Sequence, residues 1–123
     1  MIDASGSIVG YYTLSAFSIE SGELPDAIAR KLPRYPLLPA TLIGRLAVSQ
    51  AHHGRGLGRV LLADALKRSF NSTSNVGSIG VIVDALDEGA RAFYIRHQFA
   101  QLKDHASRLF LPMATIEKAA KVR

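Results

Sequence analysis

A glycine-rich segment near the middle of the chain has the residue types and spacing of an anion-binding turn. The segment from His53 to Gly58 reads His-Gly-Arg-Gly-Leu-Gly, and it lies between an apolar run typical of a strand and one typical of a helix. Backbone amides converge at the start of a helix, where the positive end of its dipole attracts phosphate groups. Glycine suits this place because a side chain would block the anion and because some amides need positive φ. The segment predicts a phosphate-binding turn, and a plain strand-to-helix connection is the alternative.

The spacing of these glycines disfavours two common nucleotide sites. The segment lacks the Gly-Lys-Ser/Thr ending of NTPase phosphate loops, and its third glycine comes one residue early for a dinucleotide fingerprint. Other clusters are weaker. The adjacent His52 and His53 lack a carboxylate or cysteine set at ligand spacing, so no metal site is predicted. A strand end and a helix cap account for Asp84, Asp87 and Glu88, which leaves no evident general base.

Apolar periodicity divides the chain into strands and helices that would position these residues. Strands are predicted over residues 8–19, 42–48, 79–85, 99–102 and 109–113, and helices over 26–32, from 57 to the polar run 71–75, over 88–97 and in the tail 114–123. The near-continuous apolar run 79–85 is typical of a strand buried on both faces, which favours a central place. Three prolines, Pro33, Pro36 and Pro39, predict an irregular connector before residue 42. The expected fold class is α/β (α+β mixed), with a mixed central sheet flanked by helices.

Length and composition fit a single domain over residues 1–123. The chain is 48% apolar and 20% charged, the balance of a globular protein with a real core. It has no cysteine, which excludes disulfides and thiolate sites, and no run approaches the ~18 apolar residues of a membrane span. Without a signal-peptide pattern, a cytoplasmic protein that binds no membrane is expected. Fifteen Lys and Arg against ten Asp and Glu give a formal charge of +5, which favours polyanions or anionic cofactors.

The glycine turn is part of a longer pattern. His53 to Gly58 is similar to the GNAT signature, in which Gln or Arg is followed by two residues, Gly, one residue, and Gly or Ala, with His53 at the first place. Residues 46–48 look like the strand of that family that pairs with the pantetheine arm of the cofactor. Residues 92–99 resemble its second signature, Phe-Tyr followed by a phenylalanine five residues after the tyrosine. Gln98 replaces a frequent glycine, so this helix end is expected to close without a left-handed cap residue.

The chain is thus identified as a member of the GNAT acetyltransferase superfamily, and the resemblance implies its cofactor and site. The cofactor is acetyl-coenzyme A, with no metal. The residues implied to bind it are Leu46, Ala47, Val48, His53, Gly54, Arg55, Gly56, Leu57, Gly58 and Arg59.

Within the superfamily, residues 10–14, 44–48, 83–87 and 108–113 resemble the acetyltransferase toxins of bacterial toxin-antitoxin modules. This resemblance implies aminoacyl-tRNA as acceptor and a ribbon-helix-helix antitoxin as partner. Arg45 is the candidate contact to a tRNA phosphate, and an ordinary ion pair is the alternative. Because the family domain begins with a strand and two helices that this sequence lacks, we expect an N-terminally shortened GNAT fold. Its strand 8–19 would be an exposed edge that favours a homodimer.

Direct acetyl transfer requires an oxyanion donor and a proton for the leaving thiolate. A backbone amide near Val48 is the candidate donor to the carbonyl oxygen. Tyr94, in the second signature, is the candidate catalytic acid because a phenol with a pKa of ~10 keeps its proton at neutral pH; a core aromatic is the alternative. The missing general base favours an α-amine, whose pKa of ~7.7–8 leaves it partly neutral.

Two other functions remain open at this point. One is a GNAT enzyme acting on a small amine or a protein N-terminus. The other is a shortened, inactive domain that only binds cofactor or partners.

Overall fold

The fold is a mixed sheet with helices on both faces. The computed structural model describes residues 10–32, 36–48, 56–76, 78–103 and 105–121. Its strands form one sheet in the order β1-β2-β3-β5-β4, and they are β1 (Gly10–Glu20), β2 (Leu37–Val48), β3 (Gly80–Asp84), β4 (Ala100–Leu102) and β5 (His105–Pro112). The helices are η1 (Ser21–Glu23), α1 (Asp26–Ala29), α2 (Leu57–Val76), α3 (Glu88–Arg96) and α4 (Met113–Lys121). The predicted mixed α/β architecture is confirmed.

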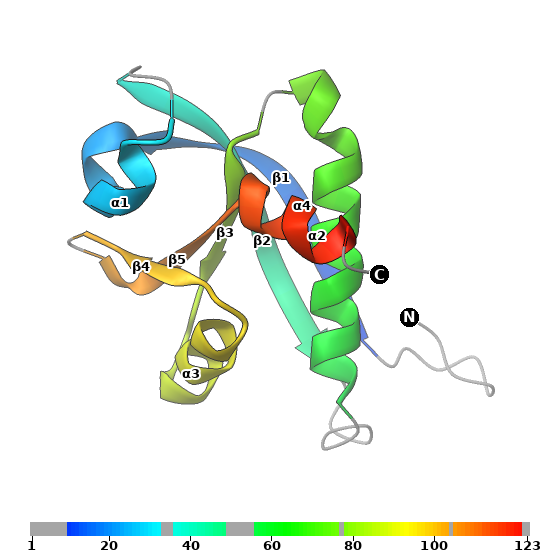
Figure 1. Cartoon of the computed structure of the whole chain (residues 1–123). Helices are drawn as coiled ribbons and strands as arrows, with labels where there is room; N and C mark the ends of the chain where they lie inside the picture. Colours follow the sequence, from blue (N-terminus) through cyan, green and yellow to red (C-terminus); the bar gives the residue numbers. More distant parts are fainter. Residues whose placement is uncertain (1–9, 33–35, 49–55, 77, 104, 122–123) are drawn as a thin grey trace.

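α1 lies on one side of the sheet and α2 and α4 lie on the other (Figure 1). A hydrophobic cluster packs on each of the two faces. Val81 and Val83 of β3 pack in the cluster that contains buried residues of α2, α3 and α4. Ile82, which lies between them, packs in the second cluster, against which Ile28 of α1 lies. Successive side chains of a strand point to opposite faces, so β3 is buried on both. The prediction of a central strand over this apolar run is confirmed.

β2 begins five residues earlier than predicted, at Leu37 rather than residue 42. The predicted irregular connector is therefore wrong from this residue on. β2 pairs with antiparallel β1 along its whole length, with Pro39 opposite Ser18. A proline removes one backbone donor but keeps its acceptor. The Pro39 carbonyl accepts a hydrogen bond from the Ile79 amide at 2.9 Å, so the residue still ties β2 to the chain that enters β3.

α2 also differs from its prediction, because the polar run 71–75 does not stop it and the helix continues to Val76. Asn, Ser and Thr disfavour a helix interior by less than about 1 kcal/mol each, whereas proline costs about 3 kcal/mol. Once a helix has formed, each further residue adds a backbone hydrogen bond. A polar run without proline or glycine is thus a weak stop signal.

α3 begins where the sequence predicts. Asp87 is its N-cap, and its side-chain Oδ1 accepts a hydrogen bond from the Ala90 amide at 2.8 Å. This bond satisfies one of the amides that the first turn leaves without a helical partner. The predicted cap is confirmed.

The C-terminal end of α3 corrects the expectation for Gln98. This residue adopts the left-handed conformation itself, with φ of 73°. The Phe99 amide donates to the Tyr94 carbonyl at 3.2 Å, and the Gln98 amide donates to the Ile95 carbonyl at 3.0 Å. The Tyr94 and Phe99 rings lie 5.3 Å apart, so the apolar contact that usually accompanies this double closure is present. The helix therefore closes through a left-handed residue, at the conformational cost of a non-glycine side chain there.

Candidate functional site

The two parallel strands at the centre of the sheet stay paired for only part of their length. Thr41–Ile43 of β2 pair with Val81–Val83 of β3. β2 then continues through residues 44–48, and among the described strands these pair with β1 alone. One edge of β2 is therefore left without a strand partner over this segment, which we call the open half of β2.

A β-bulge marks the place where the open half begins. Thr13 is opposite Arg45 and Leu14 is opposite Ile43, so Gly44 is the extra residue on β2. A Cβ atom at Gly44 would lie 2.8 Å from the Thr13 hydroxyl oxygen, so a larger residue there would require the Thr13 side chain to move. Bulges bend a strand and increase its twist. The bend coincides with the end of pairing to β3, and an extended ligand can use the backbone groups that this leaves.

The structure brings three of the predicted cofactor residues to this edge. Leu46 and Ala47 are half-buried, and Val48 ends the strand. Leu46 lies opposite Tyr12, whose hydroxyl bonds to α2, so the Leu46 side chain is on the α2 side of the sheet. Arg45 precedes it and therefore points to the opposite face. Its side chain is exposed, and no described residue forms an ion pair with it.

The described part of the glycine turn is an open helix start. The predicted residues His53, Gly54 and Arg55 lie outside the described residues. Gly56 has φ of 70°, is exposed, and would place a Cβ with no atom within 4 Å. Glycine is needed here for its conformation, because an L side chain disfavours positive φ.

The first turn of α2 follows at once. Leu57 begins the helix, and Arg59 is exposed in this turn. A Cβ on Gly58 would lie 3.7 Å from the Phe93 ring of α3. The turn is therefore packed against the helix that carries Tyr94.

Tyr94 has both a core ring and the properties of a proton donor. Its side chain is 7% exposed, and its ring packs edge-on against Phe93 and Phe99 with centroids 5.3 Å away in each case. Burial raises the pKa of its hydroxyl above the ordinary value of 10.0, so the group stays protonated at neutral pH. Within the described chain, no residue forms a hydrogen bond with this hydroxyl. The two predicted roles, packing and proton donation, are thus compatible in one side chain.

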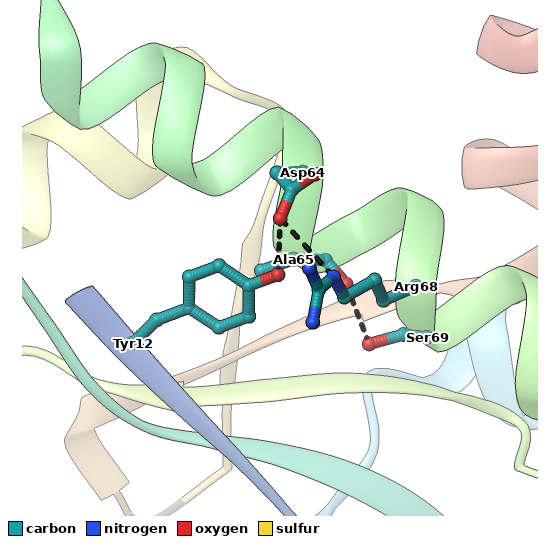
Figure 2. A network of polar contacts seen from close by, with 5 residues as sticks. All are labelled: Tyr12, Asp64, Ala65, Arg68 and Ser69. Carbon is teal, nitrogen blue, oxygen red and sulfur yellow. Dashed lines mark hydrogen bonds and ion pairs between the residues drawn. The ribbon is translucent and has the colours of Figure 1, made fainter. Parts of the chain in front are cut away.

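A polar network that the sequence did not reveal links β1 to α2. The Tyr12 hydroxyl donates to the Asp64 carboxylate, and Arg68 approaches the same carboxylate with its Nε at 3.3 Å (Figure 2). The Arg68 guanidinium also lies 5.9 Å from the centre of the Tyr12 ring. Burial, followed by the bond to Asp64, raises the pKa of Tyr12 from 10.0 to about 12. Because Tyr12 pairs with Leu46, the network holds the open half of β2 to α2 through β1.

The helical half of this network has a sequence signal. Asp64 and Arg68 are four residues apart on a predicted helix, the spacing of an ion pair. The hydroxyl of Tyr12 lies 52 positions away in sequence from its partner, and nothing local indicates that contact.

Two further observations concern the described residues only. They contain no group of three or more His, Asp or Glu side chains placed to hold a metal ion, and His52 lies outside them. None of their helices is both long enough and apolar enough to span a bilayer.

Comparison with known sequences decides the family. The model of the Acetyltransferase (GNAT) family matches residues 2–99. The chain belongs to the GNAT acetyltransferase family. The open half of β2 and the glycine turn are the parts of this GNAT chain that the resemblance associates with the cofactor.

Several relatives of this GNAT chain are toxins. It is 37% identical to a tRNA-acetylating toxin of Mycobacterium tuberculosis over 94 residues, which are 76% of this chain and 55% of that toxin. It therefore spans about half the length of that relative. A structure of the toxin AtaT complexed with acetyl-methionyl-tRNAfMet has a TM-score of 0.86 and 32% identity, covering 96% of this chain and 70% of AtaT.

A second AtaT structure, of a tyrosine-to-phenylalanine mutant bound to the C-terminus of the antitoxin AtaR and acetyl-CoA, has a TM-score of 0.77. The two sequences are 27% identical, and the match covers 96% of this chain and 69% of the AtaT chain. The likeness to tRNA-acetylating toxins inferred from the sequence motifs is confirmed.

Proposed function

We propose that this chain carries the acetyl-transfer site of a toxin that moves an acetyl group from acetyl-coenzyme A to the α-amino group of aminoacyl-tRNA. The observation that carries the proposal is the open half of β2, which leads toward a glycine turn at the start of α2. An unpaired strand edge suits the amide groups of a pantetheine arm, and a helix start suits a pyrophosphate. The AtaT complex with acetyl-methionyl-tRNAfMet supports the choice of acceptor.

The cofactor lies along this path. Leu46, Ala47 and Val48 pair through their backbone with the pantetheine arm. The amides of residues 53–58 hold the pyrophosphate, and Arg59 in the first turn of α2 adds a positive charge beside it. The AtaT structure that contains acetyl-CoA supports this cofactor.

Tyr94 supplies the proton of the transfer step. The neutral amine nitrogen attacks the thioester carbon, an amide near Val48 stabilises the oxyanion, and the C–S bond then breaks. The Tyr94 hydroxyl gives its proton to the departing thiolate, while the amine loses one proton to solvent. Burial raises the pKa of Tyr94, which keeps its hydroxyl protonated at neutral pH and so available to the thiolate, and the phenolate regains a proton from solvent after the transfer.

The acceptor is nucleic acid bound on the face that carries Arg45. This side chain is exposed and points away from α2, so its charge is available to a tRNA phosphate. An α-amine needs little help to lose its proton, which suits a site without an evident base. The reaction takes place in the cytoplasm, where charged tRNA and acetyl-coenzyme A meet.

Transfer of labelled acetyl groups tests the acceptor. The chain is incubated with labelled acetyl-coenzyme A and, in parallel, with aminoacyl-tRNA, the same tRNA without its amino acid, polyamines, and peptides with free N-termini. Label should enter only the aminoacyl-tRNA. Label in polyamines or peptides instead would favour the alternative GNAT acceptors. Cofactor binding without transfer to any acceptor would favour an inactive domain.

The partners proposed for this chain are a ribbon-helix-helix antitoxin and a second copy of itself. β1 is the last strand of the described sheet and carries the exposed Tyr11, so its outer edge is available for strand addition. Light scattering should report a dimer or a larger species. A chain that stays monomeric at high concentration would contradict the association.

A further inference from the structure

A pocket of about 570 Å³ lies on the face of the sheet that α2 and α4 cover. Its walls are α2, the C-terminal end of α3, the end of β5 and the start of α4. Of its described lining residues, none comes from β2 or from Gly56–Gly58, and Arg59 is the one that the proposed cofactor site also uses. Its volume is within the ~300–1,000 Å³ typical of small-molecule sites.

The pocket combines an apolar floor with a cationic rim. The floor is formed by Leu62, Leu66, Phe70, Leu111 and Ile116, and the rim carries Arg59, Lys67 and Arg96. All three cations are exposed, and none of them forms an ion pair with a described residue. No acidic side chain is among the described residues that line the pocket.

The cations are spread along the opening rather than gathered at one point. Arg59 and Lys67 are eight residues apart on α2, which places them about 12 Å apart along the helix axis. Arg96 approaches from α3, where the neighbouring His97 ring is fixed by a bond of 2.8 Å between its Nδ1 and the Phe93 carbonyl. An anionic group can therefore meet a positive charge from two helices while the rest of the ligand covers the floor.

We infer that this pocket binds a small organic anion with an apolar body, such as an aromatic or long-chain carboxylate or sulfonate. Binding removes the apolar floor from water, and it gives the rim a counter-charge that the described residues do not provide. Binding as such does not depend on the proposed function.

Fluorescence titration with 8-anilinonaphthalene-1-sulfonate tests the inference on the full chain. The probe has an apolar aromatic body and one negative charge. Lys67→Glu and Arg96→Glu should each weaken its binding by about tenfold, because an attraction becomes a repulsion. Arg30→Glu makes the same charge change at the C-cap of α1, a helix that packs against the other face of the sheet, and should change binding by less than about twofold.

Two further arms separate the pocket from non-specific binding. Ala63→Trp places a large ring at an exposed lining position and should abolish probe binding. N-phenyl-1-naphthylamine, the uncharged analogue, should bind weakly and respond little to the charge variants. Circular dichroism checks that each variant is folded, and if Ala63→Trp is not, the two charge variants decide.

Three outcomes would overturn the inference. The first is no probe binding at all. The second is equal binding by wild type, Lys67→Glu and Arg96→Glu. The third is complete displacement of the probe by acetyl-coenzyme A, which would make the pocket a part of the cofactor site.

Discussion

The two halves of β2 share one backbone but have opposite surroundings. Thr41–Ile43, in the first half, are paired on both sides, with β1 and with β3, and Leu38, Ala40 and Ile43 are buried. The open half keeps only β1, and its Gly44 and Arg45 are exposed. The bulge at Gly44 separates the two.

This difference shows how one strand can serve both stability and binding. Buried backbone groups need hydrogen-bond partners, and the first half finds them within the sheet. The open half is held by β1 and by the contact between Tyr12 and Asp64, so its position does not depend on β3. Its free edge can then be satisfied by water or by a ligand without a change of fold.

Tyr94→Phe, a change beside the proposed cofactor site, should give the largest effect. The ring would stay packed between Phe93 and Phe99, and only the proton donor would be lost. Single-turnover acetylation of charged tRNA should slow by the ~10²–10⁴-fold typical of a missing general acid, with acetyl-coenzyme A affinity nearly unchanged. Tyr11→Phe removes an exposed hydroxyl and should have little effect. Full activity of Tyr94→Phe would leave only the packing role.

Shortening one side chain on each side of the bulge should distinguish the two halves of β2 by the loss in unfolding free energy. Ile43 is 3% exposed and Leu46 is half-buried. Ile43→Ala should reduce the free energy of unfolding by about 2–5 kcal/mol, because it leaves a cavity between β2 and the helices. Leu46→Ala should cost roughly half as much, measured by urea denaturation. Equal losses would mean that the open half belongs to the core as much as the first half does.

The smallest effect concerns the contact that holds the open half. The pKa of Tyr12 is about 12 in the folded chain against 10.0 ordinarily, so folding favours the protonated form. The stability that this provides is complete below pH ~10 and is lost as the pH rises through ~12. The difference in unfolding free energy between wild type and Tyr12→Phe should therefore shrink over that interval. It should be no more than about 1 kcal/mol at neutral pH because the contact is exposed. A difference that does not change with pH would contradict the contact.

Local signals predicted the parts of the fold that depend on neighbouring residues. The apolar run of β3 indicated its central place, and Asp87 indicated the start of α3. The early start of β2 depends on pairing with β1, and the contact of Tyr12 with Asp64 joins positions far apart in sequence. The left-handed conformation of Gln98 was also missed, because the packing of Tyr94 on Phe99 outweighs the preference of a non-glycine residue for negative φ.

Isothermal titration of acetyl-coenzyme A into wild type and Gly56→Val tests the central claim most directly. Gly56 has φ of 70° and lies in an exposed turn, so valine would strain the backbone and block its approach to the pyrophosphate. Gly22→Val is the matched control, because Gly22 is also exposed with no atom within 4 Å of an added Cβ. Wild type and Gly22→Val should bind the cofactor alike, and Gly56→Val should lose most of the binding while remaining folded. Unchanged affinity in Gly56→Val would contradict the cofactor site.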